Sequence, residues 1–360
     1  MERRAKSWHR LLLWIAAVVV LLVLAGAAAM AILEWKPAEV EPTALEGRAA
    51  RVTVPSRLRI LSWNIGYASL DREADFFMDG GRGVRAPSKE RVERNLESIS
   101  KTLAGAGADI VLLQEVDIAS ARSHFVNELA FLAGVLDTYT YAYAPNFRTW
   151  VPVPFLDPLG KVESGLVTFS AFDVERAERL QLPGLPPWPV RVFHLKRCLH
   201  RLKLRGPNGR PLVVINLHLS VFDKGGRQRK VQLEYLRNLL EKTAATGAYV
   251  IAGGDWNHAP PGVGPTSFPH GGRVPEWFRQ MPGDWLPEGF SLAFDTGRPS
   301  LRSTDMPYSP GSNFITVVDG FVVGPGVKVL SVRTMEKGFY NSDHEPVLLE
   351  AELLPNGGSE

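Results

Sequence analysis

The chain has 360 residues, and its hydrophobic share of 45% and charged share of 22% are ordinary for a globular protein. Its one cysteine, Cys198, excludes an intrachain disulfide and a cysteine-rich metal site, and we expect a buried, inert thiol. The net charge of +3 owes much to residues 1–35. The near-neutral remainder therefore argues against a domain that relies on broad electrostatic attraction to nucleic acid.

The N-terminal region predicts a membrane anchor. Leu11–Leu33 contains no charged residue, and as a helix it would be roughly 34 Å long, enough to cross a bilayer core of about 30 Å. Trp8 and Trp35 flank it, and the basic residues in 1–10 favour a cytoplasmic N-terminus with the rest of a single-pass protein outside. The alternative is a cleaved signal peptide and a secreted domain, because residues 26–31 are mostly small.

The remaining chain divides into three parts. Residues 34–57 contain three prolines and no sustained apolar period, so we expect a linker, in which Val52 and Val54 could begin an edge strand. Residues 58–355 are expected to form the catalytic domain, and 356–360 a disordered tail.

Apolar strands and amphipathic helices alternate from residue 58 onward, which predicts an α/β domain. Ser88 is expected to cap the first of these helices, and Gly105 and Gly107 to end it. In the first half we predict strands over 58–64, 108–115 and 164–170, a second helix over 121–136, and a long loop over 144–160.

The second half continues this pattern. A hairpin is expected over 191–218, with its turn at residues 206–209, followed by a helix over 228–243. An apolar run then leads into Gly254-Asp255-Trp256-Asn257. After a long excursion over 259–312, strands are predicted at 314–323 and 346–353.

Polar side chains recur where these strands end. Asn64, Glu115, His218 and Asp255 each close a separate apolar strand, Asp319 lies on a further strand, and Asp343-His344 precedes the last. Open α/β sheets gather their chemistry at such strand ends. A single residue of this kind is common in loops, but six such positions together favour a functional site.

The residue types suit metal-assisted phosphoryl chemistry. Oxygen ligands without cysteine indicate Mg²⁺, or Mn²⁺ or Ca²⁺ in its place, and make zinc less favoured. Glu115 is the best candidate ligand, with Asn64 in support and Asp343 as a further candidate. A bound divalent cation would neutralise charge on phosphate oxygens.

The remaining candidates have roles in the hydrolysis itself. Asp255 could orient or deprotonate the attacking water, with Asn257, two residues further along the same strand face, holding that water or a phosphate oxygen. His218 and His344 can donate to the phosphate when protonated, and Asp319 would orient His344. Asn216 and Arg197 are the candidate substrate contacts.

These motifs resemble those of a known superfamily. The matching segments are Trp63-Asn64, Gln114-Glu115, Asn216-x-His218, Gly254-Asp255-Trp256-Asn257, Asp319 and Ser342-Asp343-His344. In this order they resemble the endonuclease/exonuclease/phosphatase superfamily, which includes deoxyribonuclease I-like nucleases, abasic-site endonucleases, neutral sphingomyelinases and inositol polyphosphate 5-phosphatases. The resemblance covers roughly residues 58–353.

The resemblance implies a four-layer α/β/β/α sandwich of two mixed sheets flanked by helices, here preceded by the transmembrane helix. It also implies a divalent metal at Glu115, water activation by Asp255 and an Asp319–His344 pair at the phosphate. One departure matters: Ser170-Ala171 stands where the family often has Ser-Arg, which weakens any transfer of substrate contacts.

The sequence defines the substrate less closely than it defines the phosphoester bond that is hydrolysed. A membrane anchor and aromatic residues in 144–160 and 259–312 favour a phosphodiesterase acting on a lipid or small-molecule phosphoester, if those aromatics are exposed rather than loop core. An extracytoplasmic nuclease is second, helped by a basic strip in 191–210 that could equally be a solvated hairpin face, and a phosphomonoesterase is third. A non-enzymatic membrane-tethered binding protein is disfavoured because Glu115, Asp255 and His344 are all present. No obligate protein partner is inferred.

Overall fold

A computed structural model describes residues 2–221 and 225–355, so the tail expected at 356–360 lies outside the described residues. The helices are α1 Glu2–Leu33, α2 Lys89–Ala106, α3 Glu128–Val135 and α4 Arg227–Ala244. The strands are β1 Val40–Pro42, β2 Leu45–Gly47, β3 Arg57–Asn64, β4 Ile110–Asp117, β5 Thr140–Val151, β6 Gly160–Ser170, β7 Val174–Gln181, β8 Cys198–Arg205, β9 Pro211–His218, β10 Tyr249–Asp255, β11 Ser291–Ala293, β12 Leu301–Arg302, β13 Ile315–Thr316, β14 Asp319–Val323, β15 Val327–Thr334 and β16 Val347–Leu353.

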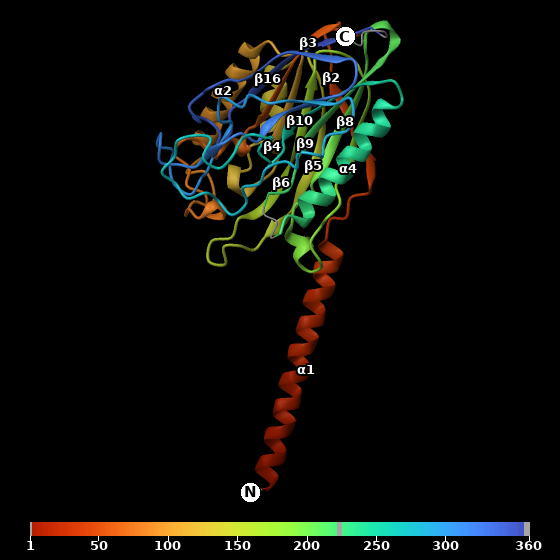
Figure 1. Cartoon of the computed structure of the whole chain (residues 1–360). Coiled ribbons are helices and arrows are strands. Elements are labelled where there is room, and N and C mark those ends of the chain that lie inside the picture. The colour runs from red at the N-terminus through yellow and green to blue at the C-terminus, as the bar shows by residue number, and fades with distance from the viewer. Residues whose placement is uncertain (1, 222–224, 356–360) are drawn as a thin grey trace.

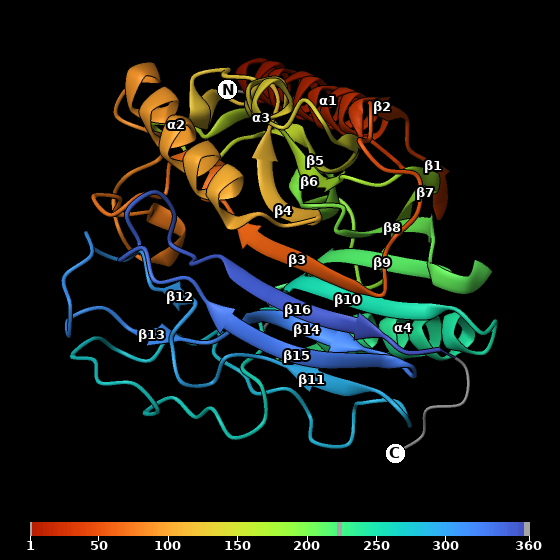
Figure 2. The same cartoon turned by 90° about the horizontal axis from the view of Figure 1, so that it is seen from above.

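Two seven-stranded sheets lie face to face. The first sheet has the order β1-β7-β8-β9-β10-β14-β11, and the second has the order β15-β16-β3-β4-β6-β5-β2. Both are mixed, because β9 and β10 run parallel in the first and β3 and β4 run parallel in the second. Helices α2 and α3 pack outside the second sheet and α4 outside the first (Figure 2). The four-layer sandwich is confirmed.

The sequence pattern explains this layering. Along β3, Leu58 and Ile60 point into the core between the sheets, whereas Leu61 and Trp63 pack beneath α2. A strand segment buried on both faces is mostly apolar, as Ile60–Trp63 of β3 is, with Ser62 as its one polar residue. Helix α2 begins where expected, because the Ser88 side chain accepts a hydrogen bond from the Arg91 backbone nitrogen, 3.3 Å away.

Two predictions in the first half were wrong. The helix expected over 121–136 is only α3, because His124 and Phe125 have positive φ angles and the Asn127 side chain caps a new start at Glu128. The loop expected over 144–160 is instead the long β5–β6 hairpin with its tip at 152–159. Pro145 misled the prediction, but it sits at a register shift of β5, where the ladder tolerates proline.

Two further differences concern strands. The single strand expected over 314–323 is divided between β13 and β14, which belong to different sheets. Strand β15 was not predicted. Half of its residues are exposed at one edge of the second sheet, so it lacks the apolar run that marks the buried strands.

The segment expected as a linker is part of the domain. Strand β1 pairs with β7 at one edge of the first sheet, and β2 pairs with β5 at one edge of the second. Val54, 1% exposed, belongs to the core between the sheets. The folded domain therefore begins before residue 58.

Helix α1 extends away from the domain (Figure 1). Residues 8–33 are apolar and long enough to cross a membrane, and their side chains are mostly exposed. A signal sequence near an N-terminus has the same length and composition, so both alternatives raised by the sequence agree with this helix.

A buried histidine joins the two sheets. His200 on β8 is fully buried, with Nδ1 3.0 Å from Thr168 Oγ1 on β6 and Nε2 3.3 Å from Thr43 Oγ1. Burial lowers the pKa of His200 from 6.5 to about 3. The unfolded chain therefore binds a proton below pH 6.5 that the folded protein rejects.

This difference predicts acid sensitivity. As the pH falls from 6.5 toward 3, His200 should lower the free energy of unfolding by about 1.4 kcal/mol per pH unit. We expect His200→Gln to remove that contribution, so that the variant loses less stability than the wild type between pH 7.5 and 5. Urea unfolding in detergent, followed by tryptophan fluorescence, measures it. Equal losses in both proteins would contradict the prediction.

Candidate active site

Strand register places three of the candidate side chains in one row. In the first sheet, Asp255 at the end of β10 pairs with His218 on β9 and with Asp319 on β14. Gly254 makes this close pairing feasible, because its φ is +149° and a Cβ there would lie 2.0 Å from the Leu217 carbonyl oxygen. The row His218–Asp255–Asp319 follows directly from the pairing of β9, β10 and β14.

The second sheet supplies the opposite wall. Asn64 at the end of β3 donates from Nδ2 to Asp255 Oδ2 over 3.1 Å. His344 lies just before β16, where its carbonyl oxygen accepts from Trp63 Nε1 at 2.9 Å and its backbone nitrogen donates to Ser342 Oγ at 3.1 Å. The two sheets therefore meet at a shared set of polar side chains.

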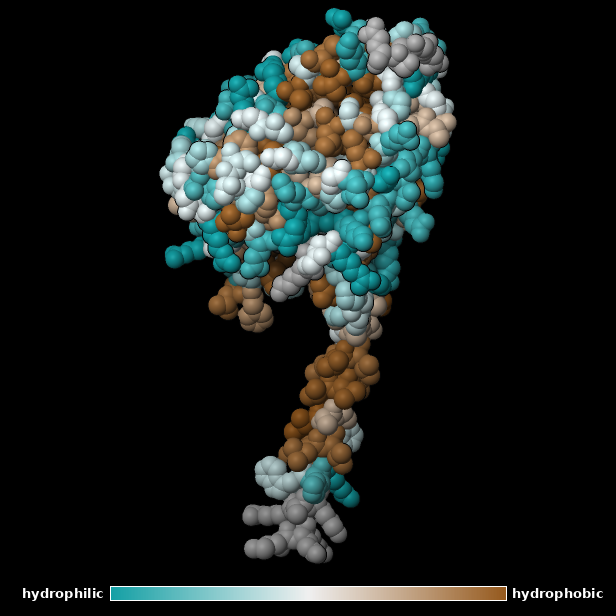
Figure 3. Space-filling view, in the orientation of Figure 1, coloured by the Kyte–Doolittle hydropathy of each residue, from teal (hydrophilic) through white to brown (hydrophobic). Residues whose placement is uncertain are grey.

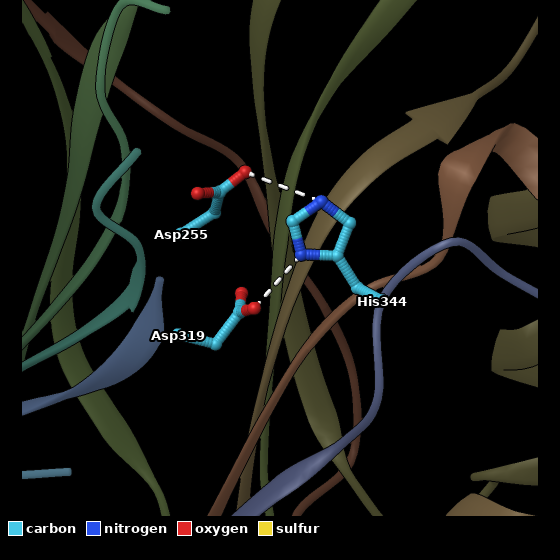
Figure 4. A group of neighbouring side chains, drawn as sticks. All are labelled: Asp255, Asp319 and His344. Carbon is cyan, nitrogen blue, oxygen red and sulfur yellow. Dashed lines mark hydrogen bonds and ion pairs between the residues drawn. The ribbon is translucent and has the colours of Figure 1, made fainter. Parts of the chain in front are cut away.

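His344 is held between two carboxylates (Figure 4). Its Nδ1 lies 2.8 Å from Asp319 Oδ2, and its Nε2 lies 3.7 Å from Asp255 Oδ2. Ser300 Oγ donates to the same Asp319 oxygen over 2.8 Å and fixes that carboxylate. Burial alone would lower the pKa of His344, but the Asp319 and Asp255 charges outweigh it and hold the pKa well above its usual range. These two charges favour the imidazolium form of His344.

His218 has the opposite charge state. Its Nε2 lies 3.2 Å from Asp255 Oδ2, yet burial, the Arg197 guanidinium and the charged His344 hold its pKa well below its usual range. These effects favour its neutral form. Its buried Nδ1 has no hydrogen-bond partner among the described residues.

Asp255 is the centre of this network. Its Oδ1 accepts from the Asn257 backbone nitrogen at 2.9 Å, and its Oδ2 faces Asn64 and both histidines. Burial raises the pKa of Asp255 to about 7, with His344 opposing the shift and Asp319 adding to it. A carboxylate that titrates near neutral pH suits a general base.

Asn257 reaches the site by a different route from the one expected. Strand β10 ends at Asp255, and Asn257 has a φ of +49°, so strand alternation does not place it. A turn does so instead, with Asn257 Nδ2 donating to the Leu219 carbonyl at 2.8 Å. Asparagine tolerates this left-handed conformation better than most residues.

Glu115 and Asp343 form a second acidic pair at the cavity. The β4–β6 register shifts between Leu113 and Val116, and Glu115 within that bulge has a φ of +56°. Bulges re-aim side chains, and this one turns Glu115 to the cavity. Burial raises the pKa of Asp343 to about 7, the charged His344 opposes this shift, and the Glu115 charge adds to it.

This pair fits a divalent cation. Two carboxylates that repel one another in a partly closed cavity would be stabilised by a cation between them, and oxygen donors are what Mg²⁺ prefers. Asn64 was expected to support the metal site, but its side chain is already occupied. Its Oδ1 accepts from the Gly66 backbone nitrogen at 3.0 Å, and its Nδ2 donates to Asp255.

A second group has the spacing of a metal site. One ligand atom each from Asp255, Asp319 and His344 lie within 4.8 Å of one another. Metal binding requires a deprotonated histidine, however, and these carboxylates keep His344 protonated. The 2.8 Å contact between His344 Nδ1 and Asp319 is better explained as a charged hydrogen bond.

The site opens into a cavity of about 280 Å³. Asn64, Glu115, His218, Asp255, Asn257, Asp343, His344 and Arg197 all line it. Arg197 is 7% exposed, and its Nη1 donates to the His218 carbonyl at 3.3 Å, so a buried positive charge faces the cavity. Asp319 supports His344 from behind this surface.

Asn216 does not line this cavity. Its Nδ2 donates to the carbonyls of Leu113 and Val167 at 3.0 Å each, and its Oδ1 accepts from Gln114 Nε2 at 2.8 Å. These contacts join β9 to the opposite sheet. The structure therefore gives Asn216 a role in holding the sheets together, in place of the expected substrate contact.

Sequence reasoning missed several lining residues. Asp79 and Thr304 line the cavity and share a 2.7 Å hydrogen bond, and Arg122 pairs with buried Asp117 beneath it. Arg122 lies in a segment predicted to be helical, and Thr304 lies in the 259–312 excursion, where no periodic pattern marked it. Asp79 lies in the stretch 75–81, whose polar residues carried no strand-end signal.

Asn64 provides a test of its own role. Its hydrogen bond lowers the pKa of Asp255, so Asn64→Ala should raise that pKa and move the acid limb of the kcat/KM profile up by about one pH unit. The Mg²⁺ concentration for half-maximal activity should stay unchanged. An unmoved acid limb with a raised metal requirement would instead make Asn64 a metal ligand.

The comparisons with known proteins agree with this geometry. The family model described as "Endonuclease/Exonuclease/phosphatase family" matches residues 61–344, which is most of the chain and includes the whole candidate site. The chain belongs to this family. The relationship expected from the motifs is confirmed.

A curated relative is the inositol phosphosphingolipids phospholipase C of Schizosaccharomyces pombe. It is 28% identical over 200 residues, which cover 52% of this chain and 41% of that protein. The matched region thus spans less than half the length of that relative.

Solved structures of the family share the fold. An endonuclease/exonuclease/phosphatase from Beutenbergia cavernae has a TM-score of 0.55 at 18% identity, over 83% of this chain and 72% of that one. A counterpart from Bacteroides vulgatus has a TM-score of 0.54 at 16% identity, over 82% and 99%. TDP2 of D. rerio, complexed with a single-strand DNA product, has a TM-score of 0.51 at 16% identity, over 82% and 99%.

Proposed function

We propose that this protein is a divalent-metal-dependent phosphodiesterase that hydrolyses a lipid or small-molecule phosphodiester by activated-water attack. The observation that carries the proposal is Asp255, a buried carboxylate with a pKa near 7, flanked by neutral His218 and cationic His344 in one cavity. Family membership supports the phosphoester chemistry.

In this proposal each side chain has one task. Asp255 accepts the proton of the attacking water, which Asn257 helps to orient. His344, kept cationic by Asp319, and the buried Arg197 stabilise negative charge on the phosphate oxygens. His218, with its neutral form favoured, contacts Asp255 through Nε2 and positions that carboxylate. These groups are fixed by hydrogen bonds before substrate arrives, which lowers the cost of reorganisation.

Glu115 and Asp343 would hold the metal, with Mg²⁺ proposed first and Mn²⁺ or Ca²⁺ as alternatives. When bound, it would supply charge neutralisation for the phosphate and the leaving oxygen.

The cavity wall favours a substrate with an apolar part. Besides the polar groups, the apolar side chains of Phe76, Phe77, Phe147 and Leu159 line the cavity. A lipid phosphodiester would use this wall, whereas a nucleic-acid backbone would not. The name of the S. pombe relative, a phospholipase C acting on phosphosphingolipids, is consistent with that choice.

The basic strip gives less support to the nuclease alternative. Arg201 pairs with Glu178, and Lys203 and Arg205 both pair with Glu175. Because acidic partners offset these charges, the strip is not a continuous positive track for a phosphate backbone. An extracytoplasmic nuclease remains the second candidate, given the fold shared with TDP2, and a phosphomonoesterase the third.

The proposed location follows from α1. We assign it as a retained single membrane span, with residues 1–10 cytoplasmic and the catalytic domain extracytoplasmic. Protease added to intact cells should then digest the domain, and full protection would reverse the orientation.

A parallel substrate panel tests the activity. Full-length protein is assayed on sphingomyelin, phosphatidylinositol, DNA, RNA and bis-p-nitrophenyl phosphate, with Mg²⁺, Mn²⁺ or Ca²⁺. We expect metal-dependent turnover, fastest on a lipid phosphodiester. No turnover of any phosphoester would refute the proposal.

Glu115→Gln tests the proposed metal site. Loss of one carboxylate ligand should raise the metal concentration for half-maximal activity by about 10- to 100-fold, comparable to losses seen when metal sites are weakened. Excess metal should restore part of the rate. Glu288→Gln, at an exposed position outside the cavity, is the matched control. A metal requirement equal to that of the control would remove Glu115 from the site.

A further inference from the structure

The tip of the β5–β6 hairpin exposes large apolar side chains. Phe155 is 89% exposed and Leu156 is 94% exposed, and Val153 and Trp150 behind them are each more than half exposed. In the 259–312 excursion, by contrast, Trp285 packs inward and is 6% exposed. Exposed apolar groups at a strand tip mark an interaction site.

Helix α1 ends directly against the domain, with no free spacer. Leu33 is its last residue, and the next residue, Glu34, is buried. Glu34 Oε1 accepts from Arg191 Nε at 3.0 Å and from Lys196 Nζ at 3.2 Å. The apolar span therefore stops at the surface of the domain beside the short helix η4, Val190–Phe193.

The hairpin is linked to that same surface. Thr149 Oγ1 on β5 donates to the Val192 carbonyl at 2.9 Å, and the Lys196 backbone nitrogen donates to the Asn146 carbonyl at 2.7 Å. Figure 1 shows the β5–β6 tip extending from the side of the domain where α1 leaves it, and Figure 3 shows apolar groups there. If α1 spans a bilayer, the tip lies at that bilayer.

We propose that the tip of the β5–β6 hairpin inserts into the phospholipid bilayer that α1 spans, so that the catalytic domain is seated on the membrane at two points. Arg148 and Lys161, each more than half exposed in their side chains, lie on the hairpin behind the apolar tip, where both pair with Glu163 and the three side chains leave one net positive charge. Basic groups in that position suit lipid phosphates, while Phe155 and Leu156 suit the acyl region. The order of charge and apolarity along the hairpin matches that of a membrane surface.

Insertion of the hairpin tip also determines how substrate reaches the active site. Val151, Val153 and Leu159 of the hairpin and Phe193 and Leu195 next to the α1 contact all line the active-site cavity. An apolar wall thus runs from the membrane-facing tip to the polar groups. This second step rests on the proposed function. The substrate is a lipid of the same membrane, and it reaches the polar groups along that apolar wall without passing through water.

Site-specific labelling tests whether the hairpin tip inserts into the membrane, without any assay of activity. Cys198 is buried, so Phe155→Cys gives the full-length protein one accessible thiol for a polarity-sensitive fluorophore. Val52→Cys is the matched control, because Val52 is 60% exposed and lies away from the hairpin tip. The nearby Ala50 backbone nitrogen donates to the Thr138 carbonyl, just before the opposite end of β5. In phosphatidylcholine vesicles we expect the probe at 155 to be blue-shifted and quenched by spin-labelled lipid, and the probe at 52 to remain water-exposed.

Equal, water-like emission at both positions would overturn the proposal that the hairpin tip inserts into the membrane. Such a result would mean that the tip contacts a protein partner or solvent. Because this readout needs no turnover, it stands even if the phosphodiesterase proposal fails.

Activity measurements test the second step. The double variant Phe155→Ser with Leu156→Ser should lose about tenfold in hydrolysis of vesicle lipid, because the apolar tip no longer partitions into the bilayer. Hydrolysis of soluble bis-p-nitrophenyl phosphate should be unchanged, which also shows that the variant is folded. Val52→Ser should change neither rate. Equal loss on both substrates, or no loss on vesicles, would refute delivery from the membrane.

Discussion

Asp255→Asn should reduce kcat by about 10³-fold or more, because general-base assistance alone is typically worth about 10²- to 10⁴-fold. The substituted amide keeps the shape of the side chain and an oxygen that can accept from Asn257, but it cannot take a proton from water. KM should change little, since the substrate contacts assigned to Arg197 and His344 remain. Steady-state kinetics on the best substrate of the panel measures both constants.

The control for this variant is Asp284→Asn. Asp284 is exposed and lies outside the cavity, so the same chemical change there should leave the rate intact. Thermal unfolding of Asp255→Asn should be close to that of the wild type or higher, because a buried carboxylate with a raised pKa is itself destabilising at neutral pH. A near wild-type kcat would remove Asp255 from the role of base.

The second large effect concerns the His344–Asp319 pair. His344→Gln should lower kcat by about 10³-fold, since it removes a positive charge aimed at the phosphate in a buried site. Asp319→Asn should cost about 10²-fold, because it leaves the imidazole in place but no longer favours its protonation.

The double variant distinguishes one unit from two independent groups. If Asp319 acts through His344, the double variant should be no slower than His344→Gln alone. Independent actions would multiply the two losses. His270→Gln, a histidine outside the cavity, controls for the histidine substitution itself. The pH profile of Asp319→Asn adds a separate check, because loss of the carboxylate lowers the pKa of His344 and should move the alkaline limb to lower pH.

Much of the site could be predicted because strand ends are visible in sequence. Buried strands are mostly apolar, so a polar residue at the end of one stands out, as Asn64, His218 and Asp255 do. The parallel pairs β3–β4 and β9–β10 then bring these ends to the same edge of their sheets. Local pattern and topology therefore agree at this edge.

Other parts depend on contacts that local pattern does not encode. Asn216 has the same strand-end signal as its neighbours, yet its amide is used between the sheets. Glu115 reaches the cavity only through a bulge, which no residue type near it required. The β5–β6 hairpin contains prolines and exposed aromatics that suggest a loop, and its pairing arises from long-range register.

The two short strands that follow α1 have a consequence for solubility. Strand β1 covers the edge of the first sheet at β7, and β2 covers the edge of the second at β5. Each is three residues long, and Pro42 cannot donate to a further strand. The segment from Val40 to Gly47 therefore blocks edge-to-edge association at one edge of each sheet. A chain shortened to residue 58 would leave β5 and β7 as open templates for self-assembly, whereas one shortened only to residue 36 would keep both covered.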